Sequence, residues 1–185
     1  MCCRYRDSFP AALDDVAEAY RSSQAIGQVA IIGERLGAAL AAALLVGLRD
    51  EGTGLPRCAA LVSALLDLSM HAPSLRLNAA ADPEVDVAEL RRQVVRHAGT
   101  TPLTDPLLSP LHANLHGLPP IQLLTAGNDV LLDDSVAFAA RAARSGMTVD
   151  LRVRPTAASL RADGGPDMAA FIWTWTAPRR AMTCN

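Results

Sequence analysis

The stretch that decides the fold reads Gln28-Val29-Ala30-Ile31-Ile32-Gly33-Glu34-Arg35-Leu36-Gly37. Its first half is a short apolar run of strand formers, and its second half is a tight turn that carries two glycines. Leucines then recur every four residues from Leu36 to Leu48, which is typical of one face of a helix, and Gly52 marks its end. The stretch therefore predicts a strand, a sharp turn and a helix in immediate succession.

Working outward, the next apolar run, residues 58–66, follows Gly54-Leu55-Pro56 and predicts a second strand. A strand, a helix and a strand in this order favour a parallel sheet that is buried on both faces. Two more strands are expected, with helical patterns before, between and after them. The expected strands are 121–126 and 147–153, and the expected helices are 86–97, 133–145 and 166–175. We predict an α/β fold with a parallel sheet of about four strands and flanking helices.

Composition narrows the class of protein. Half of the 185 residues are apolar, 19% are charged and the formal net charge is -2, which fits one globular domain over 1–185 and gives no basic footprint for nucleic acid. The longest apolar run, 37–48, is shorter than the about 20 residues that a membrane span requires. The N-terminus has no secretory pattern, and the four cysteines show no metal-ligand spacing, so free thiols in the cytoplasm are expected. These cysteines are Cys2, Cys3, Cys58 and Cys184.

Several short segments, taken in order, resemble one family. They are Phe9-Pro10-Ala11-Ala12-Leu13-Asp14-Asp15 with Ala19-Tyr20-Arg21, Ser63-Ala64-Leu65-Leu66-Asp67-Leu68, Asp105-Pro106-Leu107-Leu108-Ser109-Pro110-Leu111, Gly117-Leu118-Pro119-Pro120 and Gly127-Asn128-Asp129-Val130-Leu131-Leu132-Asp133-Asp134. Their order and spacing are similar to the C-terminal part of α/β-hydrolase fold-3 proteins, the esterases and lipases that resemble hormone-sensitive lipase. The resemblance implies a partial α/β-hydrolase fold without the family's N-terminal strands, and carboxylic esters as the ancestral substrates.

The resemblance also implies a catalytic triad that has lost two of its members. The family's G-x-S-x-G turn corresponds to Gly33-Glu34-Arg35-Leu36-Gly37, so Arg35 occupies the position of the nucleophilic serine. Ser159 occupies the position of the histidine base, and only Asp129 matches the family's acid. A guanidinium stays protonated and cannot attack a carbonyl carbon, and a serine hydroxyl is too weak a base to accept its proton. The HGGG loop that completes the oxyanion hole is absent from these residues.

Some residues carry alternative interpretations. An ion pair between Arg35 and Asp129 could replace the triad, or Arg35 could point to solvent. His112 and His116 have the spacing of a zinc-binding pair on a helix, or they are surface histidines; we expect no metal and no cofactor. Trp173 and Trp175 could form a binding patch, although aromatic residues near a terminus usually cover core. A rewired hydrolase would need a serine from Ser63, Ser69, Ser109, Ser135 and Ser159, and a base from His71, His97, His112 and His116.

Three functional hypotheses follow. The first is a degenerate, catalytically inactive esterase-like protein, and the second is a non-catalytic module that binds a partner or ligand. The third is a weak carboxylic-ester hydrolase with a rewired site. The resemblance also leaves the strand near Val29–Ile32 without its family neighbour, so we expect an exposed apolar edge that allows self-association.

Overall fold

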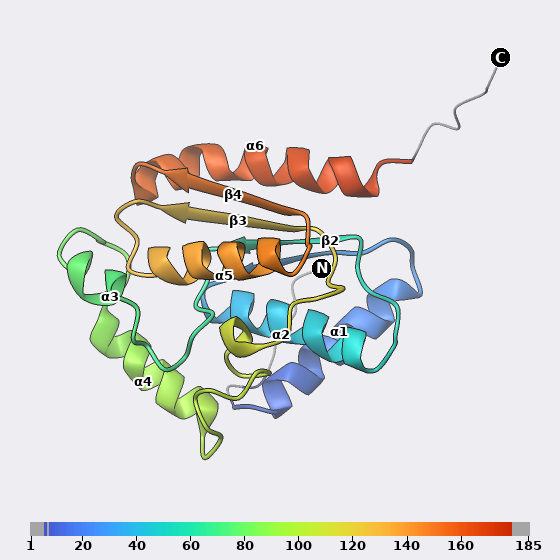
Figure 1. The fold of residues 1–185 in the computed structure, drawn as a ribbon, viewed down its shortest axis with the longest axis horizontal. Coiled ribbons are helices and arrows are strands. Elements are labelled where there is room, and N and C mark those ends of the chain that lie inside the picture. The colour runs from blue at the N-terminus through green and yellow to red at the C-terminus, as the bar shows by residue number, and fades with distance from the viewer. Residues whose placement is uncertain (1–5, 7, 179–185) are drawn as a thin grey trace.

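The computed structural model describes residues 6 and 8–178, which form one parallel four-stranded sheet with helices on both faces (Figure 1). The strands lie in the order of the sequence, β1-β2-β3-β4. Their bounds are β1 Ala30–Glu34, β2 Cys58–Val62, β3 Ile121–Ala126 and β4 Val149–Arg154. The α-helices are α1 Ala11–Gln24, α2 Leu36–Asp50, α3 Ser74–Leu77, α4 Val87–Ala98, α5 Leu132–Arg144 and α6 Ala157–Thr176, and the short 3-10 helix η1 is Pro110–His112. The predicted α/β class and parallel sheet are confirmed.

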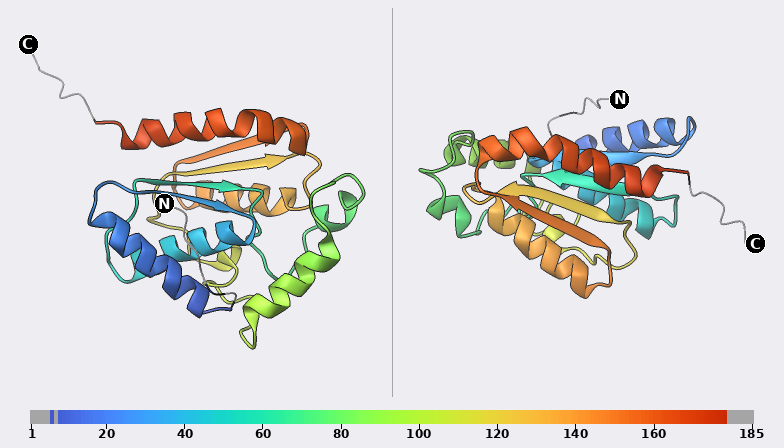
Figure 2. Two further views of the ribbon diagram at one scale, coloured as in Figure 1. Left: turned by 180° about the vertical axis from the view of Figure 1, so that it is seen from behind. Right: turned by 90° about the horizontal axis from the view of Figure 1, so that it is seen from above.

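The helices divide between the two faces of the sheet (Figure 2). Helices α2 and α5 pack on one face, and α1 lies against α2 on the same side. Helix α6 alone packs against β2, β3 and β4 on the other face. The main core lies between the sheet and the α2–α5 layer, where buried side chains such as Leu45, Leu61, Leu123 and Phe138 meet. The carboxyl ends of all four strands consequently open at one end of the molecule.

The decisive strand, turn and helix form as predicted. Helix α2 follows β1 after the single residue Arg35, and its leucines at positions 40, 44 and 48 are buried. Gly33 allows this sharp reversal, because a Cβ atom there would lie 2.5 Å from Gly37 O and 2.6 Å from Ala38 Cα. The first turn of α2 therefore rests directly on the backbone of β1.

Strand β2 is shorter than the apolar run predicted. It ends at Val62 rather than Leu66, because Ser63 adopts a positive φ of 44° that turns the chain out of the strand. Leu65, Leu66 and Leu68 are nonetheless buried, as residues of a loop that enters the core. Apolar character marks burial here, and burial alone does not distinguish a strand from an internal loop.

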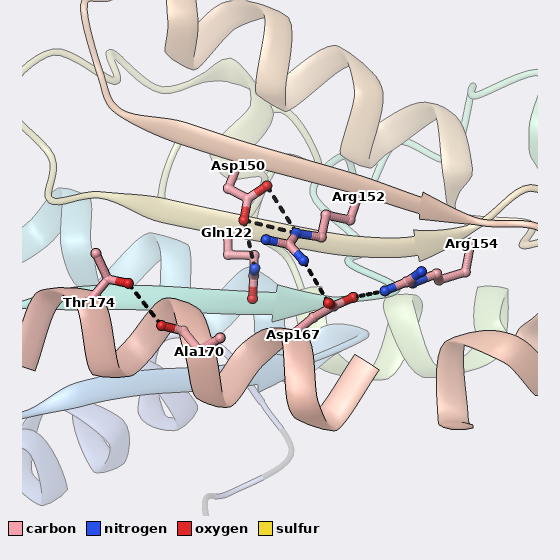
Figure 3. A network of polar contacts seen from close by, with 7 residues as sticks. All are labelled: Gln122, Asp150, Arg152, Arg154, Asp167, Ala170 and Thr174. Atoms are coloured by element: carbon pink, nitrogen blue, oxygen red, sulfur yellow. Dashed lines mark hydrogen bonds and ion pairs between the residues drawn. The ribbon is translucent and has the colours of Figure 1, made fainter. Parts of the chain in front are cut away.

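The C-terminal helix is longer than predicted. Helix α6 begins at Ala157 instead of 166, because Thr156 caps it: Ser159 N donates to Thr156 Oγ1 at 3.2 Å, and Thr156 N donates to Ser159 Oγ at 3.1 Å. Polar contacts tie it to the sheet, since Asp167 accepts hydrogen bonds from both Arg152 and Arg154 of β4 (Figure 3). These contacts and the cap overcome the Gly-Gly-Pro sequence at 164–166.

Helix α1 and the cysteines complete the comparison with the sequence. No sequence pattern predicted helix α1, yet Ala12 and Tyr20 are buried, and Tyr20 packs with Leu44 and Leu48 of α2. Gly54 O accepts a hydrogen bond from Tyr20 Oη at 2.7 Å. Of the four cysteines, only Cys58 lies within the described residues, where its thiol is free and buried. No helix in the described residues is long and apolar enough to cross a membrane.

Substituting Gly33 by Ala tests the close approach of β1 and α2. We expect Gly33→Ala to lower the free energy of unfolding by about 1–3 kcal/mol, because the added methyl group meets backbone atoms that cannot move aside. Gly37→Ala is the matched control, since no atom lies within 4 Å of a Cβ there and alanine favours the helix by up to about 1 kcal/mol. Urea unfolding measures both; equal losses of stability would contradict the close approach.

Candidate functional site

The turn between β1 and α2 holds Arg35 in a strained conformation. Arg35 has φ 52° and ψ -119°, which L-residues rarely adopt. Its N–H donates to Val62 O at 3.1 Å, and its own carbonyl accepts from Ala38 N at 3.0 Å and Leu65 N at 3.3 Å. These bonds fix the turn to both neighbouring segments. The geometry presents the side chain of residue 35 at the carboxyl end of the sheet.

A small cavity of about 150 Å³ lies beside this turn. Its walls come from the ends of β1 and β2, the loop after β3, the segment that precedes α4 and the first turn of α6. The lining residues are Glu34, Arg35, Val62, Ser63, Asp82, Glu84, Val85, Asp129, Ala157, Leu160 and Arg161. Two of the residues that the sequence analysis singled out, Arg35 and Asp129, thus line the same cavity.

The predicted ion pair between Arg35 and Asp129 is wrong. Arg35 Nη2 lies 3.3 Å from Glu84 Oε2, and Arg161 of α6 contacts the other carboxylate oxygen of Glu84. Glu84 therefore bridges two guanidinium groups across the mouth of the cavity. No sequence pattern indicated this partner, because Glu84 lies 49 residues from Arg35 in an irregular segment.

Asp129 is held by its own loop instead. Its side chain is buried, with 4% exposure, and its two oxygens accept hydrogen bonds from Leu131 N at 2.8 Å and Thr125 Oγ1 at 3.2 Å. Asn78 also reaches this loop, with its amide 2.8 Å from Asp129 O. A carboxylate that accepts such bonds can remain buried without an imidazole. Its contacts thus organise the loop after β3.

Ser159 lies outside the cavity lining, because the cap of α6 uses it. Its hydroxyl donates to Thr156 O at 2.8 Å and accepts from Thr156 N. Ala157, Leu160 and Arg161 of the same helix turn line the cavity in its place. The position that matches the family's base therefore has a capping role.

None of the four histidines lines this cavity. His112 Nε2 lies 3.1 Å from Asp67, His71 Nδ1 lies 2.9 Å from Ser69 Oγ, and His116 Nδ1 lies 3.3 Å from Ser145 O. His97 is buried at the end of α4. His112 and His116 thus have different partners, and the described residues hold no group of three or more metal-ligating side chains.

The candidate nucleophiles also separate. Ser63 is the one of the five that lines the cavity, whereas Ser109 bonds to Leu68 N and Leu103 O in the interior. Ser135 is fully buried on α5. Ser69 contacts His71, but within the described residues no hydrogen bond joins that ring to a carboxylate. These contacts do not form the hydrogen-bonded chain from serine to histidine to carboxylate that a catalytic triad requires.

Asp134 is a buried carboxylate in the first turn of α5, to which the sequence assigned no functional role. Its Oδ2 accepts hydrogen bonds from Leu66 N at 2.8 Å and Asp67 N at 2.9 Å, which hold the loop after β2 against α5. Burial raises the pKa of Asp134 to about 6. The hydrogen bonds from the two backbone N–H groups lower this pKa, whereas the nearby charges of Asp67 and Asp133 raise it further. A buried loop outside regular secondary structure needs acceptors for its backbone N–H groups, and this need is the signal that could have indicated such a carboxylate.

Comparison with known proteins identifies the family that the sequence motifs resemble. Residues 6–158 match the model of the alpha/beta hydrolase fold. An acetyl-hydrolase of Streptomyces hygroscopicus is 37% identical over 151 residues, which are 80% of this chain and 50% of that protein. An esterase of Acinetobacter venetianus is 30% identical over 151 residues, 78% of this chain and 50% of the relative. The chain spans about half the length of these curated relatives.

Solved structures agree. A crystal structure of an esterase from the bacterial hormone-sensitive lipase family superposes with a TM-score of 0.83 at 32% identity, over 91% of this chain and 61% of that one. A parallel sheet with a strained turn between a strand and a buried helix defines the class of α/β hydrolase scaffolds. The chain belongs to the alpha/beta hydrolase fold-3 family, with relatives among the hormone-sensitive-lipase-like esterases.

Asp134→Asn tests the buried carboxylate. The pKa of Asp134 in the folded state, about 6, lies above its ordinary value of 3.8. Its protonation therefore contributes fully to the free energy of unfolding below pH 3.8, and this contribution is lost as the pH rises through 6. An asparagine oxygen can accept the same two N–H bonds without a charge. We expect the variant to match the wild type near pH 4 and to exceed its stability near pH 7.5, by on the order of 2 kcal/mol. A pH-independent difference in urea unfolding would contradict the raised pKa.

A double-mutant cycle tests the partner of Arg35. We expect Arg35→Gln and Glu84→Gln to couple by about 0.5–1 kcal/mol, since the pair is partly solvated and Arg35 Nε has no hydrogen-bond partner among the described residues. Arg35→Gln with Asp129→Asn serves as the control cycle and should show no coupling. Coupling to Asp129 alone would restore the ion pair that the sequence suggested. Thermal unfolding at low salt provides the measurement.

Proposed function

We propose that this chain is a non-catalytic member of its hydrolase family, which keeps the scaffold of an esterase and does not hydrolyse carboxylic esters. The observation that supports the proposal is the pairing at the turn between β1 and α2, which resembles the family's nucleophile turn: the guanidinium of Arg35 lies 3.3 Å from Glu84. Its relatives include an acetyl-hydrolase and an esterase, so carboxylic esters are the substrate class that the scaffold once served.

The chemistry of ester cleavage supports this proposal. An acyl transfer needs a nucleophile that loses its proton to a base as it attacks, and donors that stabilise the oxyanion. Arg35 has no lone pair to offer, and the described lining of the cavity contains no imidazole to accept a proton. These two features affect different parts of the mechanism, the attack and the proton transfer.

The weak-hydrolase alternative rests on Ser63. This serine lines the cavity and has a positive φ of 44°, which is a strained position of the kind that active sites use. The only carboxylate neighbours in the cavity are Glu34, Asp82, Glu84 and Asp129, and a carboxylate is a poor base for a hydroxyl near neutral pH. We rank this function below the non-catalytic one for that reason.

A binding role is the second candidate function. A groove of about 880 Å³ lies between β1 and helices α1 and α2, and apolar side chains such as Tyr20, Leu40 and Leu44 line it. A cytoplasmic location belongs to the same proposal, because the thiol of Cys58 is unpaired and a reducing compartment suits it.

Hydrolysis of p-nitrophenyl acetate and butyrate tests the proposal. We expect the purified chain to show no rate above that of its Ser63→Ala variant, and a fluorophosphonate probe to label no serine, because the attacking group and the base are both missing. Ser69→Ala serves as a second control for the Ser69–His71 contact. Labelling that disappears in Ser63→Ala or Ser69→Ala would overturn the proposal and identify the rewired nucleophile.

A further inference from the structure

Glu84 joins two guanidinium groups at the cavity beside the turn between β1 and α2. Its Oε2 lies 3.3 Å from Arg35 Nη2, and its Oε1 contacts Arg161 of α6. The three residues come from three separate segments of the chain, and all of them line the cavity. The cavity therefore contains a binding position for a carboxylate group, which one of the protein's own side chains occupies.

Glu84 satisfies only part of the Arg35 guanidinium. Arg35 Nε is buried and has no hydrogen-bond partner among the described residues. In a guanidinium the N–H groups of Nε and Nη2 point to the same side, so a carboxylate that approaches this side can accept from both. Glu84 reaches Nη2 alone, because its other oxygen contacts Arg161. A buried donor without an acceptor costs free energy, so this side of Arg35 favours a carboxylate that the chain does not constrain.

The rest of the lining determines which carboxylate fits. The cavity volume of about 150 Å³ is below the roughly 300–1,000 Å³ of pockets for drug-sized ligands, so the ligand has only a few non-hydrogen atoms. Val62, Val85 and Leu160 supply apolar contacts close to the two arginines. These side chains suit a short aliphatic chain, whereas the guanidinium groups suit a carboxylate at its end.

The other acidic residues of the cavity limit how an anion can bind. Glu34, Asp82 and Asp129 also line the cavity, so an additional negative charge would be repelled. A ligand that takes the place of Glu84 adds no charge, because one carboxylate leaves as the other enters. Glu84 can leave readily, since its side chain is 29% exposed and that of Arg35 is 37% exposed, and ion pairs of this exposure are weak.

We propose that the cavity binds a short aliphatic carboxylate, such as butyrate, which displaces Glu84 and accepts hydrogen bonds from Arg35 Nε and Nη2 and from Arg161. Arg35 is the N-cap of α2, and the macrodipole of this helix favours an anion at the same place. Glu84 is then an internal competitor of the ligand. The inference rests on the proposed non-catalytic function, because the turn binds an acid and does not cleave its ester.

Calorimetric titration of the whole chain with sodium butyrate tests the proposal, with neutral butyramide as the control at equal ionic strength. We expect butyrate to bind and butyramide not to bind. Arg35→Gln and Arg161→Gln should each weaken the binding of butyrate by about tenfold or more, because each removes a charge-assisted hydrogen bond. Equal binding of butyrate and butyramide, or binding that survives both substitutions, would overturn the proposal. Far-UV circular dichroism identifies a variant that has failed to fold.

Glu84→Gln distinguishes an internal competitor from a purely structural ion pair. This variant should bind butyrate about tenfold more tightly than the wild type, because a neutral amide competes less well for the two guanidinium groups. Glu89→Gln is the matched control: Glu89 also bridges two arginines, Arg92 and Arg96, but it lies on α4 outside the cavity lining. The control should bind butyrate like the wild type. Unchanged or weaker binding by Glu84→Gln would contradict the displacement.

Nuclear magnetic resonance locates the bound carboxylate. The Nε–H signal of Arg35, identified by its loss in Arg35→Gln, should shift when butyrate is added and stay in place when butyramide is added. An unchanged signal in a chain that binds butyrate would exclude this site. Ester hydrolysis is measured separately, so the two proposals fail in different ways. Hydrolysis of p-nitrophenyl esters overturns the proposed function, whereas a chain that neither hydrolyses esters nor binds butyrate overturns this inference alone.

Discussion

The structure depends on the close approach of Gly33 to the first turn of α2. Only a residue without a side chain leaves room for Gly37 O and Ala38 Cα at 2.5 and 2.6 Å from the position of a Cβ. This approach lets the chain reverse within one residue, sets the direction of α2 across the sheet and forces Arg35 into a strained conformation. In the family such a turn exposes a nucleophile. Here the same geometry persists with a side chain that cannot attack.

The charge of Arg35 at the turn determines how the polar groups of the cavity pair. A guanidinium is always charged and requires an acceptor, and Glu84 supplies one while also contacting Arg161 of α6. Asp129 forms no ion pair with Arg35, and its oxygens accept hydrogen bonds from Leu131 N and Thr125 Oγ1. The polar groups around the cavity are thus joined by ion pairs and by hydrogen bonds within loops. This arrangement underlies the proposal of a non-catalytic family member.

Carboxylates at the start of α5 show a second use of charge inside the fold. Asp134 ties the loop after β2 to the helix, and Asp133 accepts a hydrogen bond from Ser74 N at 2.8 Å. These acceptors satisfy backbone donors in the loop after β2 and at the first residue of α3. The cost is the desolvation that raises the pKa of Asp134 to about 6. The loops that bring Ser63, Asp82 and Glu84 to the cavity are held by such contacts, since Val130 N also donates to Asp82 at 3.1 Å.

The sequence by itself determined the local features whose cause lies within a few residues. Strand β1, helix α2 and the turn between them follow from an apolar run, two glycines and a leucine repeat, and the family follows from ordered motifs. Tertiary structure decided the end of β2 at Val62, because apolar residues occur alike in strands and buried loops. The start of α6 has a local cause in the Thr156–Ser159 cap, whereas its continuation through Gly-Gly-Pro depends on packing against the sheet. Tertiary structure also decided the partner of Arg35. Any of several carboxylates could have met that guanidinium, and only folding brings Glu84, 49 residues away, within reach of it.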